Sequence, residues 1–230
     1  MAEPNPYVGP RPFQTDDRGR FYGRDGEINQ LVPLLYAHRL TVLFAQSGAG
    51  KTSLLNAGVL PVLIEDEGFE VLGRNDGSGN STRVSGVSAK EAEAAGVRNI
   101  YTYNALSGWL PTDQAPAGGA TLASFLAQRD HLADAAGDPA PRLAIFDQFE
   151  EVFTAYPDRW QERDDFFRQL REALDADPML RIVLSLREDY LANLDPFLAV
   201  FRGISTLTFR LERLKKDDAL SAVADPLKGT

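Results

Sequence analysis

The chain has 230 residues, which is enough for one α/β domain with a sizeable core. Its composition, with 43% hydrophobic and 25% charged residues, is ordinary for a globular protein and argues against disorder. The formal net charge of -9 repels a phosphate backbone on average, so no nucleic-acid partner is expected. There are no cysteines, which excludes disulfides, thiolate metal sites and cysteine nucleophiles.

The N-terminal sequence "MAEPNPYVGPRPF" lacks the basic-then-apolar arrangement of a signal peptide. No apolar run approaches the ~18 residues that a membrane span requires. The expectation is a soluble, cytoplasmic protein with no membrane partner.

Residues 1–24 are rich in proline, glycine and aromatic residues, which predicts an ordered arm lying on a surface. A helix is expected to start at Asp25 or Gly26, with an apolar face and a bend at Pro33. That face consists of Ile28, Leu31, Leu34 and Leu35. Residues 40–44 form a continuous apolar run, typical of a strand that is covered on both faces.

The segment "AQSGAGKTS" that follows is close to the phosphate-binding pattern G-x-x-x-x-G-K-[ST], with Ala45 at the first glycine position. In such a loop, glycines allow backbone N–H groups to approach phosphate oxygens, and the next helix adds its positive N-terminal end. Lys51 is expected to neutralise phosphate charge, and Thr52 to offer its hydroxyl to Mg²⁺. The alternative is a glycine-rich turn without a ligand. The candidate nucleotide-binding residues of the loop are Ser47, Gly48, Ala49, Gly50, Lys51, Thr52 and Ser53.

A helix should follow the loop and end near Pro61, and residues 69–72 are a further strand candidate. Residues 73–99 are turn-rich or weakly helical and are interpreted as a surface insertion. The run "NIYTYN" at 99–104 predicts a strand. The next helix is expected to carry Leu122, Phe125, Leu126 and Leu132 at helical spacing.

The second half of the chain alternates strands and helices. Strands are predicted at 143–146 and 181–187, with a helix between them that Pro178 stops, and a last strand precedes a last helix near the end. The apolar face of the middle helix is Phe166, Phe167, Leu170 and Leu174. This alternation predicts a mostly parallel sheet with helices on both faces, and such sheets bind ligands at the carboxyl ends of their strands.

The strand in "LAIFDQFEE" delivers Asp147 to such an end, as expected for an acid that holds Mg²⁺ through water. The next residue is Gln148, which can orient water but cannot take its proton. Glu150 or Glu151 would then be the catalytic base. The alternative is that both acids solvate and cap the start of a helix.

The strand in "VLSLRED" ends at Arg187, whose guanidinium could reach a γ-phosphate and detect its loss. An ion pair with Glu188 or Asp189 is the alternative. The segment "RFYGRDGEI" indicates, on spacing alone, only a turn that leads into a helix.

Taken in this order, these segments resemble the STAND class of P-loop NTPases, and specifically its novel-STAND group of bacterial signalling and defence proteins. The matching segments cover nearly the whole chain: "NPYVGPRPF", "FYGRDGEI", "AQSGAGKTSLLNAGVLP", "NIYTYN", "LAIFDQFEEVFT", "LSLREDYLANL" and "RLERLKKDDALSAVADP". The resemblance implies a three-layer P-loop NTPase core at 25–210, preceded by the arm at 1–24 and followed by the start of a helical lid at 211–230.

The resemblance also implies roles for residues outside the phosphate loop. Tyr22, Gly23 and Arg24 would lie at the adenine and ribose, Pro226 would lie near the nucleotide, and Arg187 would be the γ-phosphate sensor. The cofactors would be ATP or ADP with Mg²⁺.

Proteins of this class are switches, so the resemblance implies an ADP-bound closed monomer and an ATP-bound state that self-associates and exposes an effector. Hydrolysis would be slow, with which Gln148 is consistent. Relatives continue into further lid helices, a winged-helix domain and sensor repeats, so sensor and effector parts are expected outside this chain. Two alternatives remain: an AAA-like ATPase with steady turnover, and a scaffold that binds nucleotide without hydrolysing it.

Overall fold

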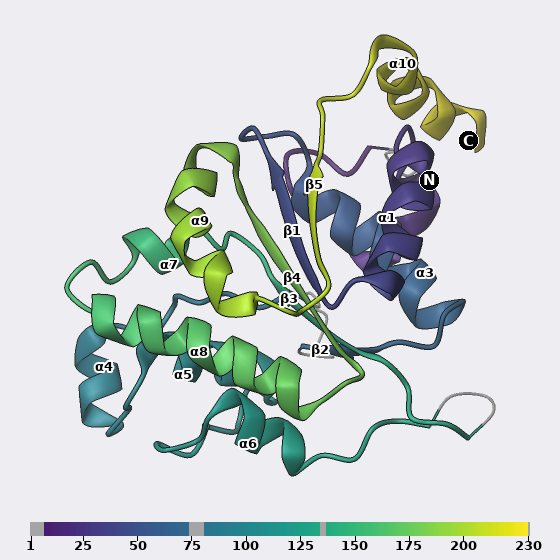
Figure 1. Cartoon of the computed structure of the whole chain (residues 1–230). Helices are drawn as coiled ribbons and strands as arrows, with labels where there is room; N and C mark the ends of the chain where they lie inside the picture. The colour runs from purple at the N-terminus through teal and green to yellow at the C-terminus, as the bar shows by residue number, and fades with distance from the viewer. Residues whose placement is uncertain (1–6, 74–80, 134–136, 230) are drawn as a thin grey trace.

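The computed structural model describes residues 7–73, 81–133 and 137–229, and Figure 1 shows a layered α/β arrangement. Within these residues a parallel sheet has the strand order β2-β3-β4-β1-β5. The strands are β1 (Leu40–Ala45), β2 (Glu70–Leu72), β3 (Arg142–Phe146), β4 (Leu180–Arg187) and β5 (Thr206–Arg210). The predicted α/β fold with a mostly parallel sheet is confirmed.

Helices connect and cover the strands. The α-helices are α1 (Asp25–Ala37), α2 (Lys51–Ser53), α3 (Leu60–Glu65), α4 (Ala89–Ala94), α5 (Ile100–Trp109), α6 (Leu122–Ala127), α7 (Glu151–Thr154), α8 (Trp160–Ala176), α9 (Leu191–Leu198) and α10 (Lys216–Ala224). A π-helical turn, η2 (Leu54–Val59), joins α2 to α3, and short 3-10 turns are η1 (Thr15–Arg20), η3 (Glu188–Tyr190), η4 (Ala199–Phe201) and η5 (Asp225–Gly229).

The core lies on both faces of the sheet because successive side chains of a buried strand point to opposite faces. On β3, Ala144 and Phe146 pack in one apolar cluster with α5, α6 and α8, while Leu143 and Ile145 pack in the other with α1, η2 and α3. The helices predicted from the apolar face of α1 and from Phe166, Phe167, Leu170 and Leu174 on α8 are confirmed. Three layers result, and the sheet is the middle one (Figure 1).

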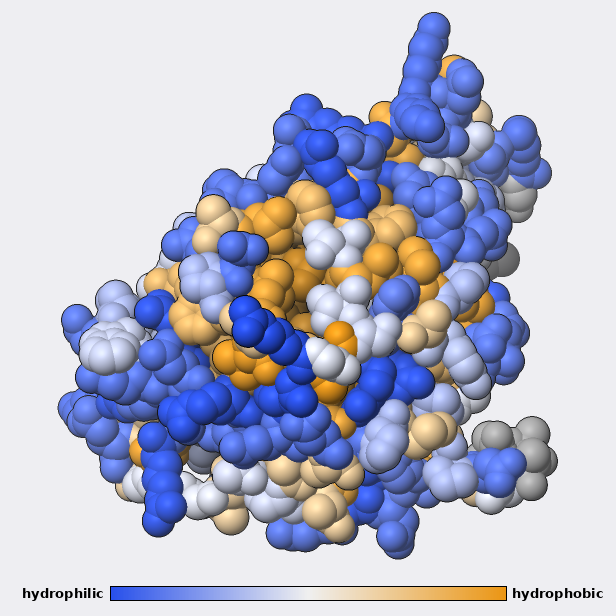
Figure 2. All heavy atoms as spheres, viewed as in Figure 1, coloured by the Kyte–Doolittle hydropathy of each residue, from blue (hydrophilic) through white to orange (hydrophobic). Residues whose placement is uncertain are grey.

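The edge strand β5 is less covered than the others. Along Thr206–Arg210 exposed residues alternate with half-buried Leu207 and Phe209. Apolar side chains accordingly gather at the surface in the middle of the face that β5 crosses, between α9 and α1 (Figure 2).

The predicted strand at 99–104 is wrong, because these residues start helix α5. Asn99 has an extended backbone, and its side-chain Oδ1 accepts the N–H of Thr102, which caps the helix. The β-branched and aromatic residues favour a strand locally, but Ile100, Tyr101 and Ala105 are fully buried in the core beside α8. Tertiary packing therefore overrides local preference.

Two predicted helix ends also differ from the structure. The helix after the phosphate loop continues past Pro61 to Glu65: the N–H of Leu60 bonds to the Leu55 carbonyl, five residues back, so the widened turn carries the helix through the proline. Helix α6 ends at Ala127, so Leu132 lies beyond it and is 61% exposed.

Part of the region interpreted as a surface insertion contributes to the core. Thr82 pairs with Phe146 in a parallel bridge and is buried, as is Val84. Residues 74–80 lie outside the described residues, and the extent of an insertion stays a prediction. The chain thus returns to the edge of the sheet beside the end of β3.

Candidate functional site

Three neighbouring strands, β3, β4 and β1, end beside one cavity of about 420 Å³ at the carboxyl edge of the sheet. Polar residues predicted from separate segments meet there, as expected for ligands of a parallel sheet. The cavity is lined by Pro12, Ser47, Gly48, Gly50, Lys51, Thr52, Ser53, Asp147, Gln148, Glu150 and Arg187.

The backbone of the phosphate loop fits close approach to a ligand. Gly48 and Gly50 have φ values of 76° and 95°, a region that favours glycine, and a Cβ added at either would meet no atom within 4 Å. Gly50 precedes the helical segment that starts at Lys51. Ala45 is the buried last residue of β1, and its φ is not positive, so this position does not need the glycine of the general pattern.

Thr52 and Asp147 are in direct contact. The Thr52 hydroxyl donates a 2.6 Å hydrogen bond to Oδ2 of Asp147, and the Ser185 hydroxyl donates one of 2.8 Å to Oδ1. Both Asp147 and Ser185 are buried, so the carboxylate is fixed from two sides. The Thr52 hydroxyl and the Asp147 carboxylate are oxygen ligands of the kind that Mg²⁺ prefers.

The residues expected to hold the metal are Thr52 and Asp147. Within the described ranges no group of three His, Cys, Asp or Glu side chains could hold a metal ion by itself. Mg²⁺ characteristically takes one or two protein oxygens and completes its coordination with water and phosphate. The arrangement therefore fits Mg²⁺ that arrives with a nucleotide.

Lys51 is half-buried at the floor of the loop. Burial lowers the pKa of its ammonium, while the carboxylates of Glu150 and Asp147 oppose that shift. Its side chain makes no ion pair or hydrogen bond with any described residue. A polyanionic ligand would supply the charge that is missing here.

The turn after Asp147 is unusual. Gln148 has a φ of 52° and is the one non-glycine residue with positive φ in the described part of the chain. The turn is held by the N–H of Phe149, which donates a 2.8 Å bond to the Ser185 carbonyl. Such backbone strain is found preferentially at functional sites.

The two glutamates that follow point in different directions. Glu150 lines the cavity, and its Oε2 accepts a 3.2 Å bond from the backbone N–H of Arg187. The carboxylate of Glu151 is bonded by Arg83 and Ser85 and does not line the cavity. Of the two glutamates, Glu150 is therefore the one that lines the cavity.

Arg187 lines the cavity but is held by its neighbour. Its Nε and Nη2 donate bonds of 3.1 and 2.6 Å to the two carboxylate oxygens of Asp189. The side-chain bond from Arg187 is the main reason why the pKa of the Asp189 carboxyl is lowered. Of the two ion-pair partners considered from the sequence, Asp189 is thus the one that Arg187 contacts, and both side chains remain about half exposed.

The residues of "FYGR" lie apart from the phosphate cavity. Buried Arg24 donates bonds of 2.8 and 2.9 Å to the carbonyls of Ala49, in the phosphate loop, and Glu212. A Cβ on Gly23 would collide with the Asp218 carbonyl on α10. Tyr22, Gly23, Arg24, Ala49 and Pro226 do not line the cavity, and their nucleotide contacts stay predictions.

Two residues near the site were missed from the sequence, and a third was not assigned to the site. Ser185 carried a signal, because it is a polar residue within an apolar strand run. Asp189 was considered only as an alternative partner for Arg187. Pro12 reaches the rim because the N–H of Phe13 donates to the Ser53 hydroxyl over 3.2 Å, and no local pattern indicates that contact.

No helix within the described residues is long and apolar enough to span a membrane. None of the curated proteins with which the sequence was compared is significantly similar to it. Among solved structures, a Walker-type ATPase of Pyrococcus abyssi is similar with a TM-score of 0.58 and 17% sequence identity. The similarity covers 96% of this chain but 60% of the other, and at this identity it shows the fold alone.

The family model described as novel STAND NTPase 1 matches residues 6–230. This range includes the phosphate loop, the strand that ends at Asp147 and the strand that ends at Arg187. The nucleotide-binding and NTPase character expected from those residues agrees with this match. The chain therefore belongs to the novel STAND NTPase 1 family.

Proposed function

We propose that this chain is the nucleotide switch of a signalling or defence protein, which binds ATP with Mg²⁺ and hydrolyses it slowly. The observation that carries the proposal is one cavity lined by Lys51, Thr52, Asp147 and Arg187, in which the residue directly after Asp147 is Gln148. Groups for binding phosphate are all present, while the position for proton abstraction holds an amide.

Each residue of the cavity has a proposed role. The loop N–H groups and Lys51 hold the phosphates, Thr52 and Asp147 hold the metal, and Glu150 accepts the proton of the attacking water. When bound, Mg²⁺ neutralises charge on the phosphate oxygens. Glu151 is not proposed as the base, since its carboxylate is bonded by Arg83 and Ser85.

Arg187 is proposed to distinguish ATP from ADP. Its guanidinium lines the cavity and pairs with an exposed carboxylate, and an exposed pair of this kind contributes little energy. A γ-phosphate, with more charge and less access to water, would compete successfully for it. ADP offers no such group, so Arg187 would remain with Asp189.

The segment 211–230 is proposed to be the start of a lid. It is linked to the arm by the hydroxyl of Tyr7, which donates a 2.9 Å bond to the Val223 carbonyl, and by the close approach of Gly23 to Asp218. Arg24 joins the carbonyl of Glu212 to that of Ala49. Movement of the phosphate loop would thereby reach α10.

Self-association in the ATP state is part of the proposal, and the apolar surface on the face crossed by β5 supports it (Figure 2).

Steady turnover would require a stronger base next to Asp147 than Gln148, and a scaffold without hydrolysis would not require Glu150 in the cavity. The whole protein's sensor and effector partners are proposed to lie outside this chain, which matches 60% of the length of its structural neighbour.

The nucleotide carried by the purified protein tests the switch. The protein is denatured, the released nucleotide is identified, and the same is done with Lys51→Ala. Retained ADP that is lost in the variant is the expected result. Purification without nucleotide, together with no measurable binding of ATP or ADP, would overturn the proposal.

A matched pair of variants tests the base. Glu150→Gln should abolish multiple-turnover ATP hydrolysis while ATP binding persists, and Glu151→Gln should retain the wild-type rate. Loss of turnover in Glu151→Gln alone would assign the base to the other glutamate. Fast steady turnover in the wild type would favour a conventional ATPase instead.

A further inference from the structure

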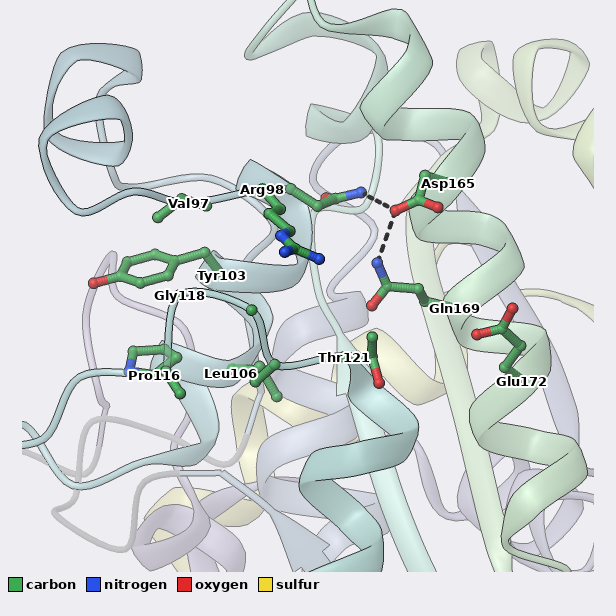
Figure 3. Close-up of a pocket in the computed structure, with 14 residues that line it drawn as sticks. Val97, Arg98, Tyr103, Leu106, Pro116, Gly118, Thr121, Asp165, Gln169 and Glu172 are labelled. Carbon is green, nitrogen blue, oxygen red and sulfur yellow. Dashed lines mark hydrogen bonds between the residues drawn. The ribbon is translucent and has the colours of Figure 1, made fainter.

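A second cavity, of about 300 Å³, lies between α5, the loop before α6, and α8, which cover the other face of the sheet from η2 and α3. Figure 3 shows that side chains from these three segments surround it. It shares no lining residue with the phosphate cavity. Its volume is at the lower limit of typical small-molecule sites, about 300–1,000 Å³.

One wall is fixed by a hydrogen-bond network. Oδ2 of Asp165 accepts a 2.9 Å bond from the Asn99 side chain and a 2.8 Å bond from the Gln169 side chain (Figure 3). Asn99 also caps α5, and Gln169 accepts the N–H of Leu122 over 3.3 Å. Asn99 and Gln169 are more than nine-tenths buried, so this wall keeps its shape without a ligand.

Two oppositely charged side chains in the lining have no partner among the described residues. Neither the guanidinium of Arg98 nor the carboxylate of Glu172 makes a hydrogen bond or ion pair with any residue that the structure describes. Arg98 comes from the segment before α5 and points into the cavity, while Glu172 extends from α8 on the other side (Figure 3). They do not approach within the 4.0 Å of an ion pair, although both face the same space.

The remaining wall is apolar or backbone. Tyr103 and Leu106 on α5 and buried Pro116 form it, together with the turn at Gly118 and Gly119. The N–H groups of these two glycines donate no hydrogen bond within the described part of the chain. A Cβ on Gly119 would meet nothing within 4 Å, so the turn leaves the cavity open.

We propose that this cavity binds a small zwitterion of amino-acid size. Its carboxylate would pair with Arg98, and its ammonium would lie between Glu172 and Asp165, with its apolar part against Tyr103 and Pro116. A ligand with both charges satisfies both unpaired groups, whereas an anion alone would meet two carboxylates. Those carboxylates also disfavour a second nucleotide, which is a polyanion. The alternative is that both side chains are simply solvated.

The test is calorimetric titration of the full chain with the standard L-amino acids at millimolar concentrations, where weak sites become detectable. At least one should bind, and its amide and its decarboxylated amine should bind roughly tenfold more weakly. Arg98→Gln should weaken the amino acid roughly tenfold but leave the amide's binding unchanged, because the variant no longer distinguishes them. Glu172→Gln should weaken all three ligands that carry the ammonium.

Lys90→Gln is the matched control, since it removes an exposed cation on α4 that lies outside the cavity lining. Both test residues are exposed, so the variants should fold, which circular dichroism checks. The proposal is overturned if no amino acid binds, or if binding persists unchanged in Arg98→Gln and Glu172→Gln.

Discussion

Charged side chains gather at both edges of the sheet, but their bonding differs. At the amino edge, Arg142 begins β3, is 1% exposed, and donates to Glu70 over 2.9 Å and to the carbonyls of Arg129 and Asp130 over 2.7 and 2.6 Å. At the carboxyl edge, the ammonium of Lys51 has no partner among the described residues, and the guanidinium of Arg187 pairs with the exposed carboxylate of Asp189.

The difference separates structure from function. A buried charge whose bonds are all made within the chain contributes to folding, because any loss leaves its partners desolvated. A partly buried charge without a partner is compensated only by a ligand. The site could thus be distinguished from the amino-edge cluster by the completeness of bonding, although both edges are rich in charge.

The largest effect is expected when the buried charge at the amino edge, Arg142, is removed. Arg142→Met should lower the free energy of unfolding by about 3–5 kcal/mol, because Glu70 and Asp177 lose a buried partner. Urea denaturation measures this. Lys51→Met is the control at the other edge and should cost less than about 1 kcal/mol, since no bond within the chain is lost. Equal losses would contradict the comparison.

A smaller effect concerns the carboxylate of Asp147. Ser185→Ala removes one of the two hydrogen bonds to this carboxylate. The Mg²⁺ concentration for half-maximal ATP binding should then rise roughly tenfold, because the removed residue orients a metal ligand. Binding of ATP without Mg²⁺ should not change. Thr41→Val is the control, because the buried Thr41 hydroxyl has no hydrogen-bond partner in the part of the chain that the structure describes. It should leave the Mg²⁺ dependence as in the wild type. Equal weakening with and without Mg²⁺ would indicate a merely structural role.

Nucleotide affinity should change when the charge of Asp189, the partner of Arg187, is removed. Asp189→Asn frees Arg187, so ATP affinity should rise by up to about fivefold while ADP affinity stays constant. Fluorescence titration with labelled nucleotides measures both. Glu188→Gln is the matched control, because Glu188 pairs with Arg210 instead. A similar gain for ADP would show that Arg187 does not read the γ-phosphate.

The last effect is a pH dependence in the arm. Hydrogen bonds from Arg11 lower the pKa of buried Asp17 from 3.8 to about 2. Its contribution to stability is therefore present above pH 3.8 and is lost as the pH falls through about 2. Urea denaturation over this range should show a smaller loss in Asp17→Asn than in the wild type. The exposed neighbour provides the control Asp16→Asn, which should follow the wild-type curve.

Much of the site could be predicted from sequence because its residues follow strands. An apolar run of strand length comes before each of Lys51, Asp147 and Arg187. Such a run is enough to place the side chain at the carboxyl edge of the sheet, and no long-range contact needs to be known. The three layers followed from the same alternation of strands and helices. Ala45 could also be accepted at the first glycine position of the phosphate loop from sequence, because the strand extends to this residue and a strand does not require glycine.

Other features depended on contacts that no local pattern encodes. Residues 99–104 have strand-forming side chains but become a helix because burial on most sides, and the cap at Asn99, outweigh local preference. Similarly, "EE" gives two identical carboxylates. Bonds from Arg83 and Ser85, in a distant segment, hold Glu151 away from the cavity, while Glu150 lines it. Sequence by itself determined the order of elements and the chemistry available at the strand ends. Tertiary structure decided which of those side chains are bonded to other residues and which remain available to a ligand, because this bonding depends on residues far apart in the chain.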